Sequence, residues 1–165
     1  MALPKRKHLT RLNHLFRLPV GEVYFVTAAC ANKRAIFSDA RCAELAAKTF
    51  SVCTERHGYE VLLSCVMPTH FHAVIAARER SSSLSELVRG WKTWCARQLR
   101  ALGVEGKVWQ NEFFDHRIRS KTSLAAKCEY VVQNPVRAGL AERAEEWPHT
   151  GGTWWDAYLA RGGAG

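Results

Sequence analysis

Apolar positions recur along the chain with two different periods, and one of them is the period of β-strands. The segment 22–27 is rich in β-branched and aromatic residues, which is typical of a strand. The segments 59–67 and 70–76 have the same character, and because only two residues separate them we expect a hairpin or another tight connection. The sequence over 108–119 also has extended character. The pattern therefore predicts four strands.

Three other segments carry apolar residues at the spacing of helices. The first covers about 39–55 and starts at residues suited to capping. The second, to about residue 102, follows a capping box formed by Ser83 and Glu86. The third, 121–133, should end near Asn134, because a proline disfavours the helical conformation of the residue before it.

The predicted order is strand, helix, strand, strand, helix, strand, helix. This is the layout of an α+β, ferredoxin-like split βαβ sandwich, an antiparallel sheet with helices on one face, followed here by a C-terminal helix. The pattern also allows a short helix over 140–146. We divide the chain into a basic arm, 1–20, one domain, 21–146, and a C-terminal extension, 147–165, whose end at 162–165 we expect to be disordered.

Length, composition and charge narrow the class of protein. A chain of 165 residues with 47% hydrophobic and 24% charged residues is typical of one packed domain, which excludes fibrous and disordered classes. The net charge of +9 comes mostly from arginine, whose planar guanidinium suits phosphate recognition. We therefore expect a polyanion as partner, although charge alone is equally compatible with a protein that is merely basic.

The sequence indicates neither a targeting segment nor a set of cysteines spaced for disulfides or for a metal site. Its charged start is not followed by a secretory apolar region, and no run of about 18 apolar residues occurs, so we expect a cytoplasmic protein without a membrane partner. The six cysteines lack C-x-x-C spacing and fall mostly in apolar runs. We expect them to pack as small hydrophobes rather than to form disulfides or a zinc site.

Two histidines open the predicted strand 70–76. His70 and His72 are separated by one residue, so both imidazoles should project from one face of the sheet while Phe71 points to the other. Two metal ligands can converge in this way. Two histidines also meet on one strand by chance in a chain that has seven, so the pair alone leaves both interpretations open.

The predicted helix 121–133 and its end carry the side chains that suit such a pair. Tyr130 and Asn134 are four residues apart, so they share a helix face at about 6 Å from one another. A phenol and an amide oxygen can thus meet the two imidazoles. Periodicity by itself also allows Tyr130 to be a core residue with its hydroxyl at the surface.

Three segments in this order resemble a known family: residues 67–72 (MPTHFH), 108–110 (VWQ) and 130–140 (YVVQNPVRAGL). Over roughly residues 20 to 145 the chain is similar to REP-associated tyrosine transposases, which belong to the IS200/IS605-like Y1 transposase family of HUH endonucleases. Thr69 stands where such proteins commonly have asparagine, and the stretch 147–150 matches their pattern only loosely.

The resemblance implies a metal-dependent endonuclease and transposase that cleaves and rejoins DNA. It implies that His70 and His72 bind a divalent ion and that Tyr130 is the nucleophile, which leaves a 5′-phosphotyrosine and a free 3′ hydroxyl. Asn134 stands where the transposases have a glutamine as third ligand, and Gln133 is the alternative. Because imidazole binds Mg²⁺ or Mn²⁺ weakly, substrate phosphate oxygens and water are expected to complete the shell.

The partner that the resemblance implies is single-stranded or hairpin DNA of the REP type, bound by a monomer or a homodimer. Exposed cations and aromatic rings are the usual means of gripping such strands. The candidate DNA-binding residues are Lys33, Arg34, Arg89, Lys92 and Arg119. The tryptophans Trp91, Trp94 and Trp109 have apolar neighbours, so we expect them mainly in the core.

Asp115 and His116 are candidates for orienting the metal-binding histidines, because ligand imidazoles usually have a hydrogen-bonded partner. The alternative is that both are ordinary polar surface residues.

Other functions remain open at this point. A hairpin-binding module of the same fold that no longer cuts DNA would need the basic surface but not Tyr130. A hydrolase that uses metal-bound water would need a carboxylate or a third histidine near His70, which the sequence lacks. A purely structural role leaves the histidine pair and the tyrosine unexplained.

Overall fold

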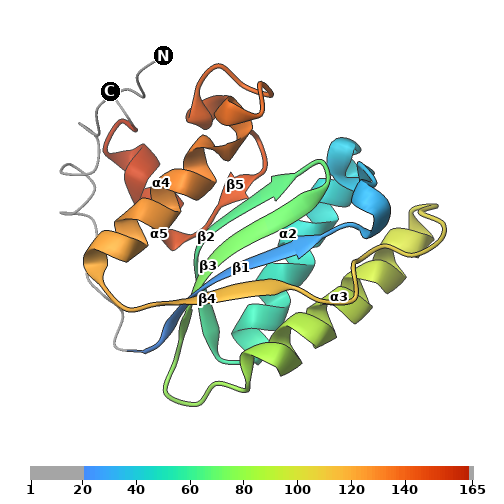
Figure 1. The fold of residues 1–165 in the computed structure, drawn as a ribbon, viewed down its shortest axis with the longest axis horizontal. Coiled ribbons are helices and arrows are strands. Elements are labelled where there is room, and N and C mark those ends of the chain that lie inside the picture. Colours follow the sequence, from blue (N-terminus) through green and yellow to red (C-terminus); the bar gives the residue numbers. More distant parts are fainter. Residues whose placement is uncertain (1–20, 164–165) are drawn as a thin grey trace.

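The computed structural model describes residues 21–163, which form a five-stranded antiparallel sheet with helices on both faces (Figure 1). The elements are β1 (Val23–Ala29), α2 (Ala40–Arg56), β2 (Tyr59–Met67), β3 (His70–Ala77), α3 (Leu84–Ala101), β4 (Phe114–Ile118), α4 (Lys121–Arg137), β5 (Thr150–Gly151) and α5 (Thr153–Ala160). The strand order β4-β1-β3-β2-β5 is that of a ferredoxin-like sheet with one added edge strand. The predicted fold class is confirmed. The predicted basic arm, 1–20, lies outside the described residues, as do Ala164 and Gly165.

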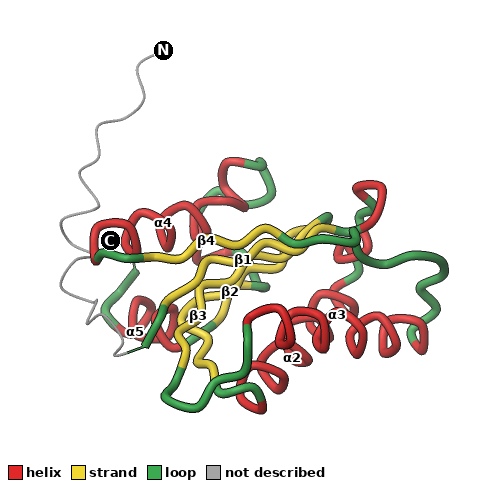
Figure 2. The backbone as a smooth tube through the Cα atoms, turned by 60° about the horizontal axis from the view of Figure 1, so that its bottom comes forward, coloured by secondary structure: helices red, strands yellow, loops and turns green. Residues whose placement is uncertain are grey.

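The central strand β3 separates two cores by the alternation of its side chains. Phe71, Ala73 and Ile75 pack under the layer of α2 and α3, whereas Val74 and Ala76 pack under α4. Figure 2 shows α4 on the opposite side of the sheet from α2 and α3. The face that carries α4 is therefore also the face from which the histidines of β3 project.

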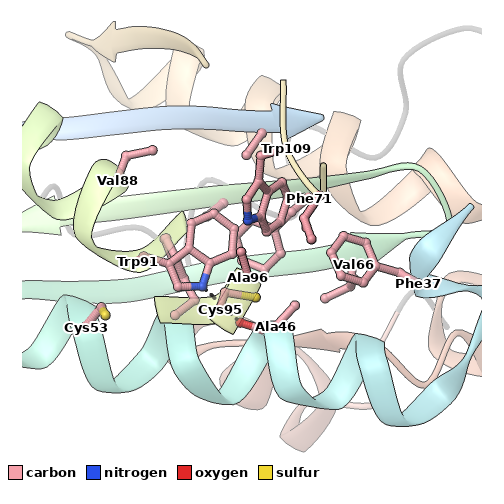
Figure 3. Close-up of a cluster of buried hydrophobic side chains, with 14 of the residues drawn as sticks. Phe37, Ala46, Cys53, Val66, Phe71, Val88, Trp91, Cys95, Ala96 and Trp109 are labelled. Atoms are coloured by element: carbon pink, nitrogen blue, oxygen red, sulfur yellow. Dashed lines mark hydrogen bonds between the residues drawn. The ribbon is translucent and has the colours of Figure 1, made fainter. Parts of the chain in front are cut away.

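A cluster of aromatic rings fills the core beneath α2 and α3 (Figure 3). Trp91 is fully buried, and its ring lies 4.9 Å from that of Trp109 and 4.8 Å from that of Phe71. The Trp91 indole N–H donates to the Ala46 carbonyl (3.3 Å) and to the Thr49 hydroxyl (3.2 Å), which satisfies its one polar atom. The expectation that the tryptophans lie in the core is confirmed for Trp91 and Trp109.

The six cysteines are buried, as expected for small hydrophobic side chains. Burial raises the pKa of the Cys65 thiol to about 12 and that of Cys95 likewise to about 12, so both stay protonated. These thiols contribute to packing and take no part in ionic chemistry at neutral pH.

The second core contains a helix that the sequence pattern did not predict. α5 buries Trp154, Trp155 and Tyr158 together with Leu63 and Cys65 of β2. The spacing of Trp154 and Tyr158, four residues apart, is the signal that could have revealed this helix. Part of the predicted C-terminal extension is therefore packed against the sheet.

The prediction that Pro135 makes the third helix end near Asn134 is wrong, because α4 continues through Pro135 to Arg137. A proline in a helix removes the hydrogen bond from its own nitrogen and crowds the carbonyl four residues earlier, but the residues after it can still form helical bonds. The following turn remains bonded, since Ala138 N–H donates to the Asn134 carbonyl (3.0 Å). Gly139, with φ of 71°, then ends the helix in the left-handed region that favours glycine.

Two other predicted elements are shorter than expected. In the extended segment 108–119 only Phe114–Ile118 forms a strand, although Trp109 makes an isolated bridge to Cys30. Over 140–146 the structure has a single 3-10 turn, Ala144–Glu146, in place of the expected short helix. The predicted capping residues are confirmed: Asp39 caps α2, and the Ser83–Glu86 capping box begins α3.

Candidate metal and tyrosine site

A tight turn between β2 and β3 places the histidine pair. The turn is held from the side, because Cys30 N–H donates to the Thr69 carbonyl (2.8 Å) and Phe37 N–H donates to the Pro68 carbonyl (3.1 Å). β3 begins directly after it, and its register sets His72 opposite Thr27 of β1. The two imidazoles lie on the same face with ring centroids 4.6 Å apart, which confirms the predicted geometry.

Each imidazole is bonded at its Nδ1 atom by one threonine hydroxyl. Thr27 Oγ1 lies 2.8 Å from His72 Nδ1, and Thr69 Oγ1 lies 3.0 Å from His70 Nδ1. If each hydroxyl accepts the Nδ1 proton, both Nε2 atoms carry a free lone pair, which is the form in which histidine binds metals. These orienting roles were not recognised from the sequence. Thr27 is far from the histidines along the chain, and Thr69, although next to His70, was noted only as a departure from the family's usual asparagine.

Burial keeps both imidazoles neutral. It lowers the pKa of His70, and it lowers that of His72 to about 3, helped by the charges of His70, Arg137 and Lys127. His72 Nε2 is buried and has no hydrogen-bond partner among the described residues. A buried lone pair without a donor is costly, and a metal ion would satisfy it.

Tyr130 lies against the histidines from α4. Its ring packs edge-on against His72, with centroids 5.8 Å apart, and against Phe25, with centroids 6.1 Å apart. The residue is 45% exposed, so part of the tyrosine is open to solvent and to a large substrate. The core alternative for Tyr130 is therefore not supported.

Asn134 completes the group on the same face of α4. Its Nδ2 atom lies 3.3 Å from His70 Nε2. Since the oxygen and nitrogen of an amide can exchange places by rotation, the Asn134 oxygen can occupy this position instead. Gln133 is half-buried and, within residues 21–163, bonds neither histidine. The geometry favours Asn134 over Gln133 as a third ligand.

These residues fit a divalent ion held by few protein atoms. No cluster of three His, Cys, Asp or Glu side chains occurs in the described part of the chain, so two imidazoles and one amide oxygen are the available set. Such a site leaves several positions of a Mg²⁺ or Mn²⁺ shell to water and phosphate oxygens.

Two cations missed in the sequence flank the tyrosine. The Arg137 guanidinium carbon lies 4.4 Å from the centroid of the Tyr130 ring, and the Lys127 ammonium lies 5.9 Å from it. Lys127 is three residues before Tyr130 and Arg137 is seven after it, so all three side chains lie on one side of the helix. This spacing was the available signal, but the predicted helix end at Asn134 excluded Arg137.

The predicted DNA-binding residues fall on different parts of the surface. Arg89 and Lys92 line a groove of about 700 Å³ between α3 and residues 107–115, on the sheet face opposite Tyr130. Lys92 is buried there and donates to the carbonyls of Gln110 (2.6 Å) and Glu112 (3.3 Å), so its ammonium already has protein partners.

The other three predicted contacts lie on loops. Lys33 is exposed in a short turn, and Arg34 donates to the Lys107 carbonyl (2.8 Å). Arg119 is exposed between β4 and α4. The structure brings neither Lys33 nor Arg34 into contact with the histidine pair.

The predicted orienting pair on β4 is divided between the two faces of the sheet. Asp115 lines the groove beside α3, away from the histidines. His116 is opposite Phe25 and shares the face of the histidine pair, but in residues 21–163 it bonds neither His70 nor His72. The threonine hydroxyls occupy the orienting position instead.

Fold and site together define an α+β domain in which a histidine pair on the central strand meets a tyrosine and an asparagine on a helix. A family model described as transposase IS200 like matches residues 22–134, which is more than half of the chain. The chain belongs to the IS200-like transposase family.

Relatives within this class match about four fifths of the chain. A Haemophilus influenzae protein provisionally named a REP-associated tyrosine transposase is 26% identical over 140 residues, 79% of each chain. An Escherichia coli K12 REP-associated tyrosine transposase is 24% identical over 128 residues, 78% of this chain and 74% of that one. A solved structure of a REP-associated tyrosine transposase bound to a REP hairpin matches 89% of this chain and 85% of its own, at 22% identity and a TM-score of 0.72.

No helix within residues 21–163 is both long enough and apolar enough to cross a membrane.

Proposed function

We propose that this protein is a metal-dependent transposase that cleaves and rejoins single-stranded DNA beside REP-type hairpins through a 5′-phosphotyrosine intermediate. The observation that carries the proposal is the contact of the accessible Tyr130 ring with His72, whose buried Nε2 lacks a protein partner among residues 21–163. Membership of the family and the REP-associated names of the relatives support the choice of substrate. The proposal places the protein in the cytoplasm, as a monomer or a homodimer.

The residues of the site have separate tasks in this reaction. The phenolic oxygen of Tyr130 attacks the scissile phosphorus, its proton passes to solvent, and the bond from phosphorus to the 3′ oxygen breaks, which yields a 3′ hydroxyl. A Mg²⁺ or Mn²⁺ ion bound by His70, His72 and the Asn134 oxygen would polarise the phosphate and offset its charge. The threonine hydroxyls keep the imidazoles in the ligating orientation.

Rejoining reverses these bonds. A 3′ hydroxyl attacks the phosphotyrosine, a new phosphodiester forms, and the Tyr130 oxygen leaves and regains a proton. One phosphoester replaces another at each stage, so strand transfer needs no ATP.

The test compares the protein with its Tyr130→Phe variant. Each is mixed with labelled single-stranded REP-like hairpins and Mn²⁺ or Mg²⁺ and analysed on a denaturing gel. We expect a metal-dependent covalent adduct with the wild-type protein alone, while both proteins bind the hairpin equally. Equal binding with no adduct on any flanking sequence would instead identify a hairpin-binding module that does not cut.

A further inference from the structure

Four side chains form one polar stripe along α4. Lys127, Tyr130, Asn134 and Arg137 follow one another at intervals of three, four and three residues, so they stand in line on one side of the helix, beside its buried face. Tyr130 and Asn134 contact the histidine pair directly. The two cations at the ends of the stripe have no task in the reaction described above.

Both cations lie against the nucleophile. Arg137 lies over the Tyr130 ring and also donates from Nη2 to the Tyr130 carbonyl (2.5 Å), which fixes the guanidinium beside the phenol. Lys127 lies over Phe25, with its ammonium 4.7 Å from the centroid of that ring and 5.9 Å from the centroid of the Tyr130 ring. Two positive charges thus lie within the distances of cation–π contacts from the phenol ring.

Neither charge is neutralised by the described part of the protein. In residues 21–163 no carboxylate forms an ion pair with Lys127 or Arg137, and the Lys127 ammonium donates no hydrogen bond there. Unpaired cations next to an exposed nucleophile form a site for an anion.

We propose that Lys127 and Arg137 form the binding site for the scissile phosphodiester and hold its non-bridging oxygens beside the Tyr130 hydroxyl. This assignment rests on the proposed function. The cations offset the negative charge that accumulates as the phenol oxygen attacks, and the ring contact orients the phenol. Arg137 suits two phosphate oxygens at once, whereas Lys127 acts as a point charge.

The experiment separates charge from packing with matched variants. Lys127→Met and Arg137→Met keep the length and the apolar packing, and Lys127→Arg and Arg137→Lys keep the charge. Lys121→Met is the control, because position 121 is exposed and lies about two and a half turns before Tyr130, on the opposite side of α4. Adduct formation is measured in single turnover at saturating hairpin DNA, with hairpin affinity measured separately.

We expect each methionine variant to form adduct about 10- to 100-fold more slowly, since loss of one electrostatic group at a reacting oxygen costs up to about that much in a partly exposed site. The charge-keeping variants should recover most of the rate, and Lys121→Met should match the wild type. Equal losses in the Met and charge-keeping variants would overturn the proposal in favour of packing.

A second substrate tests the contact itself. A methylphosphonate at the scissile position replaces one charged oxygen with a methyl group, so it removes what the cations bind. We expect the wild-type protein to distinguish the phosphate from the methylphosphonate and the double methionine variant to lose most of this preference. An undiminished preference overturns the phosphate site. Absence of any adduct with the wild-type protein would defeat the proposed function itself, which is a different outcome.

Discussion

At the scale of single residues, two threonine hydroxyls bond the Nδ1 atoms of the histidine pair and leave the Nε2 atoms for other partners. Thr27 and Thr69 bond Nδ1 of His72 and His70, so both rings present Nε2 toward α4. The threonines come from different elements, β1 and the turn before β3. The ligating orientation is therefore a property of the assembled sheet, since only pairing of β1 with β3 brings Thr27 to His72.

Thr27→Val removes one of these hydroxyls at nearly constant volume. We expect a loss of about 1–3 kcal/mol in the free energy of unfolding, because the buried Nδ1 of His72 loses its partner. Mn²⁺ affinity should fall about 10- to 100-fold, as is usual when a ligand histidine loses its orienting group. Titration of the unfolding temperature with Mn²⁺ measures both effects. Thr122→Val, at an exposed position, is the control, and an unchanged Mn²⁺ response in Thr27→Val would contradict the orienting role.

Burial of His72 predicts how stability depends on pH. Its pKa is about 3 in the folded protein, below that of an exposed histidine, so between these values the unfolded chain binds more protons. Stability is therefore full above about pH 6.5 and falls as the pH decreases, by up to about 1.4 kcal/mol for each pH unit. Urea unfolding at pH 5 to 7 measures this slope, in a range above the titration of ordinary carboxyl groups.

The variant His72→Gln should reduce the slope, because glutamine does not titrate, and the smaller slope that remains comes from His70 and His149, whose pKa values burial also lowers. An equal slope in wild type and His72→Gln would show that His72 is not the group responsible.

At the scale of elements, α4 and α5 show how the second layer is fixed to the sheet. α4 begins at Ser120, whose hydroxyl accepts from Ser123 N–H (3.1 Å), and it keeps its helical bonding beyond Pro135. This continuation brings Arg137 back to the Tyr130 ring. α5 packs next to α4 on the same face and buries two tryptophans over β2.

Trp155→Ala tests whether α5 belongs to the domain. Trp155 is only 4% exposed, so its truncation should lower the free energy of unfolding by about 3–5 kcal/mol. Leu159→Ala on the same helix changes a side chain that is 43% exposed, and we expect a change within about 0.5 kcal/mol. Chemical denaturation of both variants gives the comparison, and similar small losses would mean that α5 does not stabilise the domain.

At the scale of the whole molecule, the net charge of +9 favours association with a polyanion along much of the surface. The site at Tyr130 and the groove beside α3 lie on opposite faces of the sheet, and both carry cations. The first 20 residues add five lysines and arginines and no acidic residue. The positive charges that attract a polyanion are thus spread over more of the protein than the residues around Tyr130.

Deletion of residues 1–20 lowers the net charge from +9 to +4, since five cations and no anions are removed. We expect weaker hairpin binding and a shallower dependence of affinity on salt, by about 0.7 in the logarithmic slope for each single-strand phosphate that the shortened chain no longer neutralises. The rate of adduct formation at saturating DNA should not change. Binding at low and at high salt provides the measurement, and identical slopes would mean that this segment does not contact DNA.

The local patterns of the sequence determined much of this protein. Alternation placed both histidines on one face, capping residues marked where α2 and α3 begin, and the order of elements gave the ferredoxin-like sheet. Such features depend on neighbours a few residues apart, so they are visible along the chain. The resemblance in three short segments indicated the family that residues 22–134 match.

Only the tertiary structure decided which side chains meet across the sheet. Thr27 orients His72, Asp115 points away from the site, and Arg137 returns to Tyr130, because strand register and the continuation of α4 past Pro135 bring together residues far apart in sequence. The burial that keeps the imidazoles neutral likewise depends on the packing of α4 against β3. The chain thus specifies its chemical groups locally, and folding fixes their orientation, burial and charge surroundings.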